Sequence, residues 1–255
     1  MAAPQGGAIE ILGCRIDAVS RDEAVSRIAA LANGGGANLV VTLGVEMVMA
    51  AQRDVAFRRV VNGAALVTCD TIGLLLDSKL RRGPLRERVT GVALVDALAA
   101  RSASLGDIRL YLMGGGGDTA QRAADALRRA HPGAIIVGAR DGYFRPDDDA
   151  AVVAAVRASG ANVLLAGLGS PKQEFWLANH LRETGCGVGI GIGGSFDIYA
   201  GNVARAPRLF QRVGLEWAYR LGKEPRRWRR QLALPRFALA ALGEALTSRK
   251  EGKSR

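Results

Sequence analysis

Short apolar segments alternate with amphipathic, alanine-rich segments through the first 199 residues of the chain. The apolar segments are hydrophobic at consecutive positions, which is typical of strands covered by helices on both faces. This alternation predicts an α/β fold with a Rossmann-like, doubly wound and mostly parallel sheet. The expected strands are 9–12, 38–42, 66–69, 109–113, 134–139, 162–166 and 188–192, and the expected helices are 20–33, 45–62, 91–102, 119–130, 147–158 and 171–184.

The positive charge of the chain is concentrated at its C-terminal end. Residues 1–199 hold 21 Lys and Arg against 20 Asp and Glu, whereas residues 200–255 hold 14 against 4. We therefore expect an α/β domain over residues 1–200 and a basic helical appendage over residues 201–255. Arginines interleaved with Trp217, Tyr219 and Trp228 suit an anionic membrane surface or a diphosphate. Nucleic acid is the competing polyanion, although the apolar stretch after Leu232 fits lipid better than DNA.

Several classes of protein are excluded by composition. No run of eighteen uncharged apolar residues is present to span a bilayer, and the N-terminus lacks the pattern of a secretory signal. Three widely spaced cysteines argue against a disulfide framework or a zinc site and favour a reducing cytosol. The acidic run Asp147–Asp149 falls at an expected helix start, where the helix dipole favours carboxylates, so we expect no metal.

Two polar residues lie at the carboxyl ends of neighbouring expected strands, where open α/β sheets bind their ligands. Asp70 follows the strand 66–69, and a carboxylate in a partly dry cleft has the basicity that a general base needs. Thr42 ends the strand 38–42 and could hydrogen-bond a substrate. The alternatives are a helix cap for Asp70 and an ordinary strand position for Thr42.

Glycine-rich segments follow three later strands. Gln173 and Glu174 begin an expected helix after Gly167–Pro171 and suit recognition of a base or sugar, with capping by Glu174 as the alternative. Gly193 and Gly194 leave room for a ligand before Asp197, which could bind a ribose or base or simply occupy a turn. The Gly114–Gly117 turn lacks the spacing of a dinucleotide fingerprint, so it supports an NAD-dependent oxidoreductase only weakly.

Eight segments together resemble the WecG/TagA/CpsF family of bacterial glycosyltransferases. They are VTLGVEMVMAAQRD, CDTIGLLL, RVTGVALV, YLMGGG, IVGARDGYF, GLGSPKQEFW, GIGGSFDIYAGNVARAP and GLEWAYRLGKEPRRWRR. The resemblance implies an inverting, metal-independent transfer, without a cofactor, of a hexosyl unit from a UDP-sugar to an undecaprenyl-pyrophosphate-linked saccharide in surface polysaccharide synthesis. It also implies a peripheral location at the inner face of the cytoplasmic membrane and self-association into a homo-oligomer.

The resemblance also assigns roles to residues. The family's proposed general base corresponds to Asp70, with Thr42 as its polar neighbour. The positions implied to line the nucleotide-sugar pocket are Arg88, Tyr143, Gln173 and Asp197. The arginines implied to close over the site and meet the acceptor's pyrophosphate are Arg220, Arg227 and Arg230.

The sequence departs from the family pattern at Gly44, Thr71 and Ala93, where the family usually has Asn, Gly and Asp. These departures leave the donor sugar open between an N-acetylmannosamine type, glucose and related hexoses. A nucleotide-binding oxidoreductase and a basic nucleic-acid-binding adaptor are the competing functions. The first requires a response to NAD(P)H, and the second requires steeply salt-dependent DNA binding.

Overall fold

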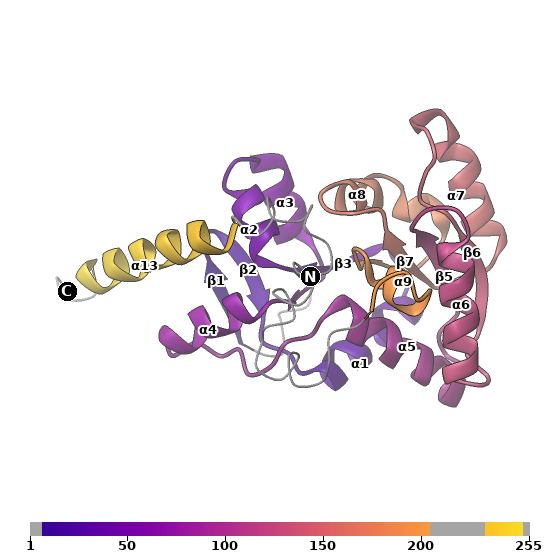
Figure 1. The fold of residues 1–255 in the computed structure, drawn as a ribbon, viewed down its shortest axis with the longest axis horizontal. Coiled ribbons are helices and arrows are strands. Elements are labelled where there is room, and N and C mark those ends of the chain that lie inside the picture. The colour runs from indigo at the N-terminus through magenta and orange to yellow at the C-terminus, as the bar shows by residue number, and fades with distance from the viewer. Residues whose placement is uncertain (1–6, 205–232, 252–255) are drawn as a thin grey trace.

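The structure is a computed structural model that describes residues 7–204 and 233–251 (Figure 1). Six parallel strands form the central sheet in the order β4-β3-β8-β7-β5-β6. This arrangement confirms the expected Rossmann-like α/β fold. The strands are β3 (Asn38–Leu43), β4 (Leu66–Cys69), β5 (Leu110–Gly114), β6 (Ile136–Arg140), β7 (Val163–Gly167) and β8 (Val188–Gly191).

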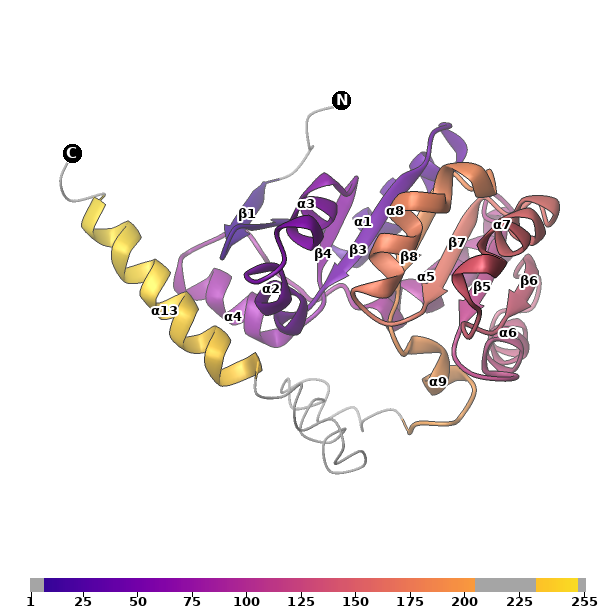
Figure 2. The ribbon, with the colours of Figure 1, turned by 90° about the horizontal axis from the view of Figure 1, so that it is seen from above.

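Helices cover both faces of the sheet (Figure 2). One face is covered by α1 (Arg21–Asn33), α5 (Gly91–Leu105), α6 (Thr119–Ala130) and α9 (Ser195–Tyr199). The other is covered by α2 (Val45–Ala51), α3 (Val55–Gly63), α7 (Asp149–Ala158) and α8 (Lys172–Thr184). A short 3₁₀ turn, η1 (Pro146–Asp148), precedes α7, and α4 (Ile72–Leu80) follows β4.

Val40 and Val41 show why the strands are apolar at consecutive positions. Successive side chains of a strand point to opposite faces of its sheet. Val40 packs in the core beneath α1 and α5, and Val41 packs in the core beneath α2 and α3. Both are fully buried, so neither face of β3 offers a position for a solvated side chain.

Several of the expected helices differ from the structure in their bounds. The expected helix 45–62 is interrupted after Ala51, because the Asp54 side chain accepts a hydrogen bond of 2.9 Å from Phe57 N–H and starts α3. The expected helix over 171–184 begins at Lys172, and its cap residue is Pro171 rather than Ser170. The capping box of Ser20 and Glu23 at the start of α1 is present as expected.

The expected first strand forms a separate two-stranded sheet. It is β1 (Ala8–Ile11), which pairs with β2 (Cys14–Asp17) in an antiparallel hairpin that the apolar pattern did not predict. The Asp17 carboxylate accepts a hydrogen bond of 2.8 Å from the Val67 N–H of β4. This side-chain contact occupies the edge of the main sheet, where a further strand would otherwise pair.

The last described helix, α13 (Ala233–Glu251), packs against α2 and α4 (Figure 2). Phe237 of α13 is buried, and Arg81 forms ion pairs of 2.8 Å with Asp77 of α4 and with Glu244 of α13. This helix therefore docks on the α/β domain, while the division at residue 200 stays a prediction. Within residues 7–204 and 233–251, no helix has both the length and the apolar character needed to span a bilayer.

Candidate active site

Glycines bring three strand-end loops into backbone contact. A Cβ atom at Gly114 would lie 2.6 Å from the Cα of Gly167, and one at Gly167 would lie 2.9 Å from the carbonyl oxygen of Gly193. Because such distances exclude a side chain, the backbones at the ends of β5, β7 and β8 pack directly against one another. A Cβ at Gly193, in contrast, would meet no atom within 4 Å, so the space beside the turn after β8 is open at the edge where such sheets bind ligands.

Asp70 lies directly after β4 and is half-buried. Its backbone N–H donates to Leu43 O over 2.9 Å, and its carboxylate accepts a hydrogen bond of 3.2 Å from Gly91 N–H at the start of α5. A Cβ at Gly91 would lie 3.1 Å from Ile192 O, so the same turn also contacts the loop after β8. Asp70 is thereby placed where the ends of β4, β3 and β8 meet.

Thr42 of β3 is in register with Thr68 of the neighbouring strand β4, so the two side chains lie on the same face of the sheet. Its side chain is 7% exposed, and its hydroxyl donates a hydrogen bond of 2.7 Å to Gly191 O at the end of β8. The hydroxyl proton is therefore used in a hydrogen bond between β3 and β8, and the lone pairs of the hydroxyl oxygen can accept other hydrogen bonds.

Arg88 lies beside Asp70 in the loop before α5. Val89 N–H donates to Cys69 O over 2.7 Å, which holds this loop along the end of β4. Burial raises the pKa of the Cys69 thiol to about 12, the Asp70 charge adds to the rise, and the Arg88 guanidinium opposes it. The side chains of Asp70 and Arg88 are thus both close enough to the Cys69 thiol to shift its pKa.

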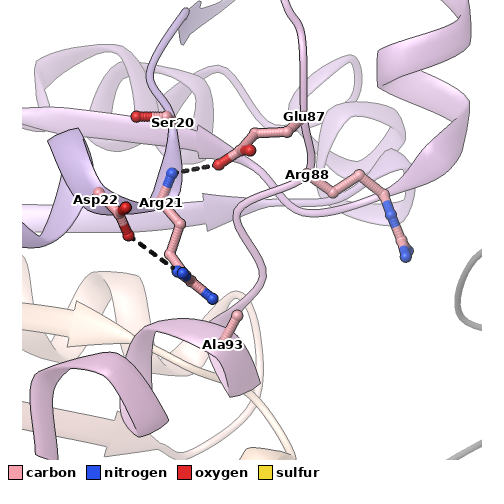
Figure 3. Close-up of a pocket in the computed structure, with 6 residues that line it drawn as sticks. All are labelled: Ser20, Arg21, Asp22, Glu87, Arg88 and Ala93. Carbon is pink, nitrogen blue, oxygen red and sulfur yellow. Dashed lines mark hydrogen bonds and ion pairs between the residues drawn. The ribbon is translucent and has the colours of Figure 1, made fainter. Parts of the chain in front are cut away.

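Arg88 also borders a cavity of about 280 Å³. Figure 3 shows its side chain pointing away from Arg21 and Glu87, which are joined by a hydrogen bond from the Arg21 backbone. The guanidinium is therefore directed away from the Glu87 carboxylate. The other residues that line the cavity are Ser20, Arg21, Asp22, Glu87 and Ala93.

Tyr143 lies in the loop after β6 and is 84% exposed. The Asp141 carboxylate accepts a hydrogen bond of 2.9 Å from Tyr143 N–H, and the ring lies 3.2 Å from the position that a Cβ at Gly116 would take. An exposed aromatic ring held over the β5 loop offers a face for a planar ligand group.

Gln173 and Glu174 lie in the first turn of α8 but do not face solvent, because they are 2% and 0% exposed. The Gln173 amide donates to Glu174 Oε1 over 2.7 Å and accepts from Gly193 N–H over 3.1 Å. The sequence predicted that both side chains lie at the ligand edge; in the structure Gln173 contacts the Gly193 backbone at that edge, and Glu174 contacts Gln173.

The segment after β8 leads into α9. Gly193 has a φ of +54°, a conformation that glycine adopts at low cost, and Gly194 caps the helix. Asp197 is half-buried, and its carboxylate accepts a hydrogen bond of 3.1 Å from Asn202, which also donates to Thr119 at the start of α6. No sequence signal pointed to Asn202. Three further predicted site residues, Arg220, Arg227 and Arg230, lie outside the described residues.

Gly44 and Thr71, two of the departures noted in the sequence, lie against each other. A Cβ at Gly44 would lie 3.2 Å from Thr71 Cγ2, and the Thr71 hydroxyl accepts a hydrogen bond of 3.2 Å from Val45 N–H. The space beside residue 44 is thus filled by the Thr71 methyl group, next to Asp70.

Asp149, in the acidic run 147–149, is used for packing between helices. Its carboxylate accepts a hydrogen bond of 2.8 Å from the Trp176 indole and lies 3.4 Å from the His180 ring. Asp147 and Asp148 lie in the η1 turn. Among residues 7–204 and 233–251 no group of three or more His, Cys, Asp or Glu side chains is arranged to hold a metal ion.

Comparison with known proteins decides the family. The model of the glycosyl transferase WecG/TagA/CpsF family matches residues 9–251. The chain belongs to this family. It is 34% identical over 211 residues to the N-acetylglucosaminyldiphosphoundecaprenol N-acetyl-beta-D-mannosaminyltransferase of Bacillus spizizenii. The aligned region covers 83% of this chain and 81% of that relative.

Membership of this glycosyltransferase family confirms the resemblance drawn from the motifs. The match runs through the α/β domain and into α13, so it includes the arginine-rich segment between them. In the described part of this glycosyltransferase, the fold brings Asp70, Thr42 and the Gly193–Gly194 turn together around the ends of β4, β3 and β8. Tyr143 lies farther along the same edge, beside β5 and β6.

Proposed function

We propose that this glycosyltransferase is a UDP-sugar-dependent hexosyltransferase that inverts the anomeric carbon and needs no metal. The observation that carries the proposal is the position of Asp70, half-buried at the end of β4 and held by Gly91 N–H over 3.2 Å. A carboxylate fixed at the ligand edge of the sheet is suited to general-base chemistry. The neighbouring Arg88 supplies positive charge for a diphosphate.

The reaction requires one base and neutralisation of the leaving group. Asp70 takes the proton of an acceptor hydroxyl while that oxygen attacks C1 of the sugar from the face opposite the diphosphate. The new C1–O bond forms as the bond to the diphosphate breaks, and UDP leaves with its electron pair. Guanidinium groups stabilise the charge that develops on UDP, from Arg88 and from Arg220, Arg227 and Arg230 of the appendage.

The donor pocket follows the glycine-lined edge of the sheet. Tyr143 offers its exposed ring for stacking on the uracil. Asp197 and the backbone of Gly193 and Gly194 provide hydrogen-bonding groups for the ribose. Thr42 adds a hydroxyl oxygen near Asp70. Gln173 and Glu174 support this pocket from beneath β8.

The acceptor is inferred from the relative, whose name specifies N-acetylglucosaminyldiphosphoundecaprenol and transfer of an N-acetyl-beta-D-mannosaminyl unit. A β product is what inversion of an α-linked donor gives. By this similarity the chain acts on an undecaprenyl-pyrophosphate-linked saccharide in surface polysaccharide synthesis. The donor hexose is N-acetylmannosamine, glucose or a related sugar. The basic appendage meets the anionic inner face of the cytoplasmic membrane.

A screen of UDP-sugars against a short-chain lipid-diphosphate saccharide tests this proposal. We expect UDP to raise the melting temperature of the protein and one UDP-hexose to support transfer without added metal. The absence of both UDP binding and hexosyl transfer, with NAD(P)H raising the melting temperature instead, would favour the oxidoreductase.

A further inference from the structure

Gln173 and Glu174 form a hydrogen-bonded pair beneath the end of β8. The Gln173 side chain donates through Nε2 to Glu174 Oε1 over 2.7 Å, and its Oε1 accepts from Gly193 N–H over 3.1 Å. These two bonds use both ends of the Gln173 amide within the protein, and the side chain is only 2% exposed. Its effect on a ligand must therefore pass through Gly193.

The Glu174 carboxylate determines which way the Gln173 amide points. A carboxylate accepts hydrogen bonds, so the amide nitrogen has to face Glu174 and the amide oxygen is left for Gly193 N–H. A flipped amide would place oxygen against oxygen and nitrogen against the backbone N–H. In a site without solvent, water cannot compensate for either contact.

The pair fits against β8 because residue 191 is glycine. A Cβ at Gly191 would lie 2.7 Å from Gln173 Nε2 and 2.8 Å from Glu174 Oε1. The carbonyl of the same glycine accepts the Thr42 hydroxyl over 2.7 Å. One short stretch of backbone thus connects the buried pair to both Thr42 and the Gly193–Gly194 turn.

Glu174 is a costly residue to place there. It is fully buried, and its Oε2 makes no hydrogen bond of good geometry within the described residues. A buried carboxyl group with an unsatisfied oxygen lowers stability relative to an apolar side chain. A role in orienting its neighbour explains the carboxyl group better than a role in packing does.

We propose that Glu174 is a positioning residue that orients the Gln173 amide and thereby holds Gly193, and the turn leading to Asp197, in the conformation that receives the donor nucleotide. This inference rests on the proposed use of a UDP-sugar. The pair acts through the backbone of Gly193 and does not contact the ligand directly.

Exchange of the two side chains tests the proposal. Gln173→Glu removes the amide donor and sets two carboxyl groups side by side, so we expect UDP affinity to fall about 10-fold, the equivalent of one buried hydrogen bond. Gln173→Glu combined with Glu174→Gln restores both bonds, because the carboxyl at position 173 accepts from Gly193 N–H and from the new amide at position 174. We expect this double variant to bind UDP within about 3-fold of the wild type.

Gln121 provides a matched control, because its amide donates to the Asp125 carboxylate over 3.1 Å on the exposed surface of α6. Gln121→Glu makes the same chemical change in solvent, and we expect UDP affinity to stay unchanged. If Gln173→Glu does not fold, Glu174→Leu removes the acceptor without adding charge and should weaken UDP binding to a similar extent.

Hydrogen exchange of the Gly193 amide, measured without ligand, separates this proposal from the proposed function. We expect faster exchange in Gln173→Glu and recovery in the double variant. Unchanged exchange in Gln173→Glu would overturn the proposal, as would a double variant that melts like the wild type but binds UDP as weakly as Gln173→Glu. A wild-type protein that does not bind UDP would overturn the proposed function, while the Gly193 measurement would still decide whether the pair holds the turn.

Discussion

The Gly91 N–H donates a hydrogen bond of 3.2 Å to the carboxylate of Asp70, which ties the start of α5 to the end of β4. The contact fixes the carboxylate beside the loop after β8, because Gly91 also approaches Ile192. A general base must be held near its reacting hydroxyl to be effective, and this turn provides that constraint for the base proposed here, Asp70.

Asp70→Asn should reduce hexosyl transfer by about 10³-fold, because the amide keeps the shape of the side chain but cannot take a proton. UDP affinity should change by less than about 3-fold, since the proposed role is in chemistry and not in donor binding. Steady-state kinetics and calorimetry measure the two effects. Asp96→Asn on the exposed part of α5 is the matched control, and transfer at the wild-type rate in Asp70→Asn would show that another group is the base.

Thr42→Val should lower both stability and transfer. The variant keeps the shape of the side chain but loses the hydroxyl bond to Gly191 O, at a cost of about 1 kcal/mol in the free energy of unfolding. Thr68→Val is a suitable comparison because Thr68 makes an equivalent bond of 2.8 Å to Val89 O. We expect equal losses of stability in denaturant titrations, with reduced transfer only in Thr42→Val; equal transfer in the two variants would remove Thr42 from the site.

Tyr143→Ala should weaken UDP binding about 10-fold, the effect of losing one base-stacking ring. Stability should change by less than about 0.5 kcal/mol, because the side chain is 84% exposed. Titration with UDP and with a sugar 1-phosphate distinguishes the uracil from the rest of the donor. Leu105→Ala, at another exposed position, should affect neither; loss of sugar 1-phosphate affinity alone would contradict stacking on the uracil.

Gly44→Ala should destabilise the protein by about 1 kcal/mol, because the added methyl group meets Thr71 Cγ2 at 3.2 Å. Thr71→Ser removes that methyl group and keeps the hydroxyl that accepts from Val45 N–H. The cost of Gly44→Ala should therefore be smaller in the Thr71→Ser background, and a double-mutant cycle by thermal unfolding measures the difference. Strictly additive effects would mean that the two side chains do not compete for the same space.

Burial raises the pKa of Glu174, and the Gln173 amide and the nearby Ser170 side chain oppose part of the rise. A raised pKa means that the folded protein holds this proton more tightly than the unfolded chain does. The contribution of Glu174 to stability should therefore decline as pH rises from its ordinary pKa near 4.5 through the raised value. The melting temperature of Glu174→Gln relative to the wild type should increase over the same interval, and a difference independent of pH would show that the carboxyl does not titrate there.

The prediction from sequence worked best where local pattern is sufficient. The strand predicted over 66–69 matches β4 in its full bounds, and Ser20 with Glu23 identified the start of α1. The prediction from sequence was less successful where one side chain changes the path of the backbone, as Asp54 does between α2 and α3. The hairpin partner β2 was missed because its four residues include two charged ones, Arg15 and Asp17, which pair with each other and with backbone groups next to or within β4.

For the candidate site, the position of Asp70 at a strand end followed from the order of residues along the chain. Its contact with Gly91 did not, because that contact joins two segments through the packing of α5. The chemical types of Gln173 and Glu174 suggested exposed ligand contacts. In the structure, the glycine at position 191 lets both side chains enter the core instead.

The sequence by itself determined the α/β class, the family, the strand-end placement of the polar residues and the concentration of positive charge after residue 199. These properties depend on periodicity, motif order and composition, which are local or additive along the chain. Only the tertiary structure decided the strand order, the docking of α13 and the burial of the Gln173–Glu174 pair. Those depend on contacts between residues far apart in sequence, where close packing and hydrogen-bond geometry select one arrangement among many that share the same local pattern.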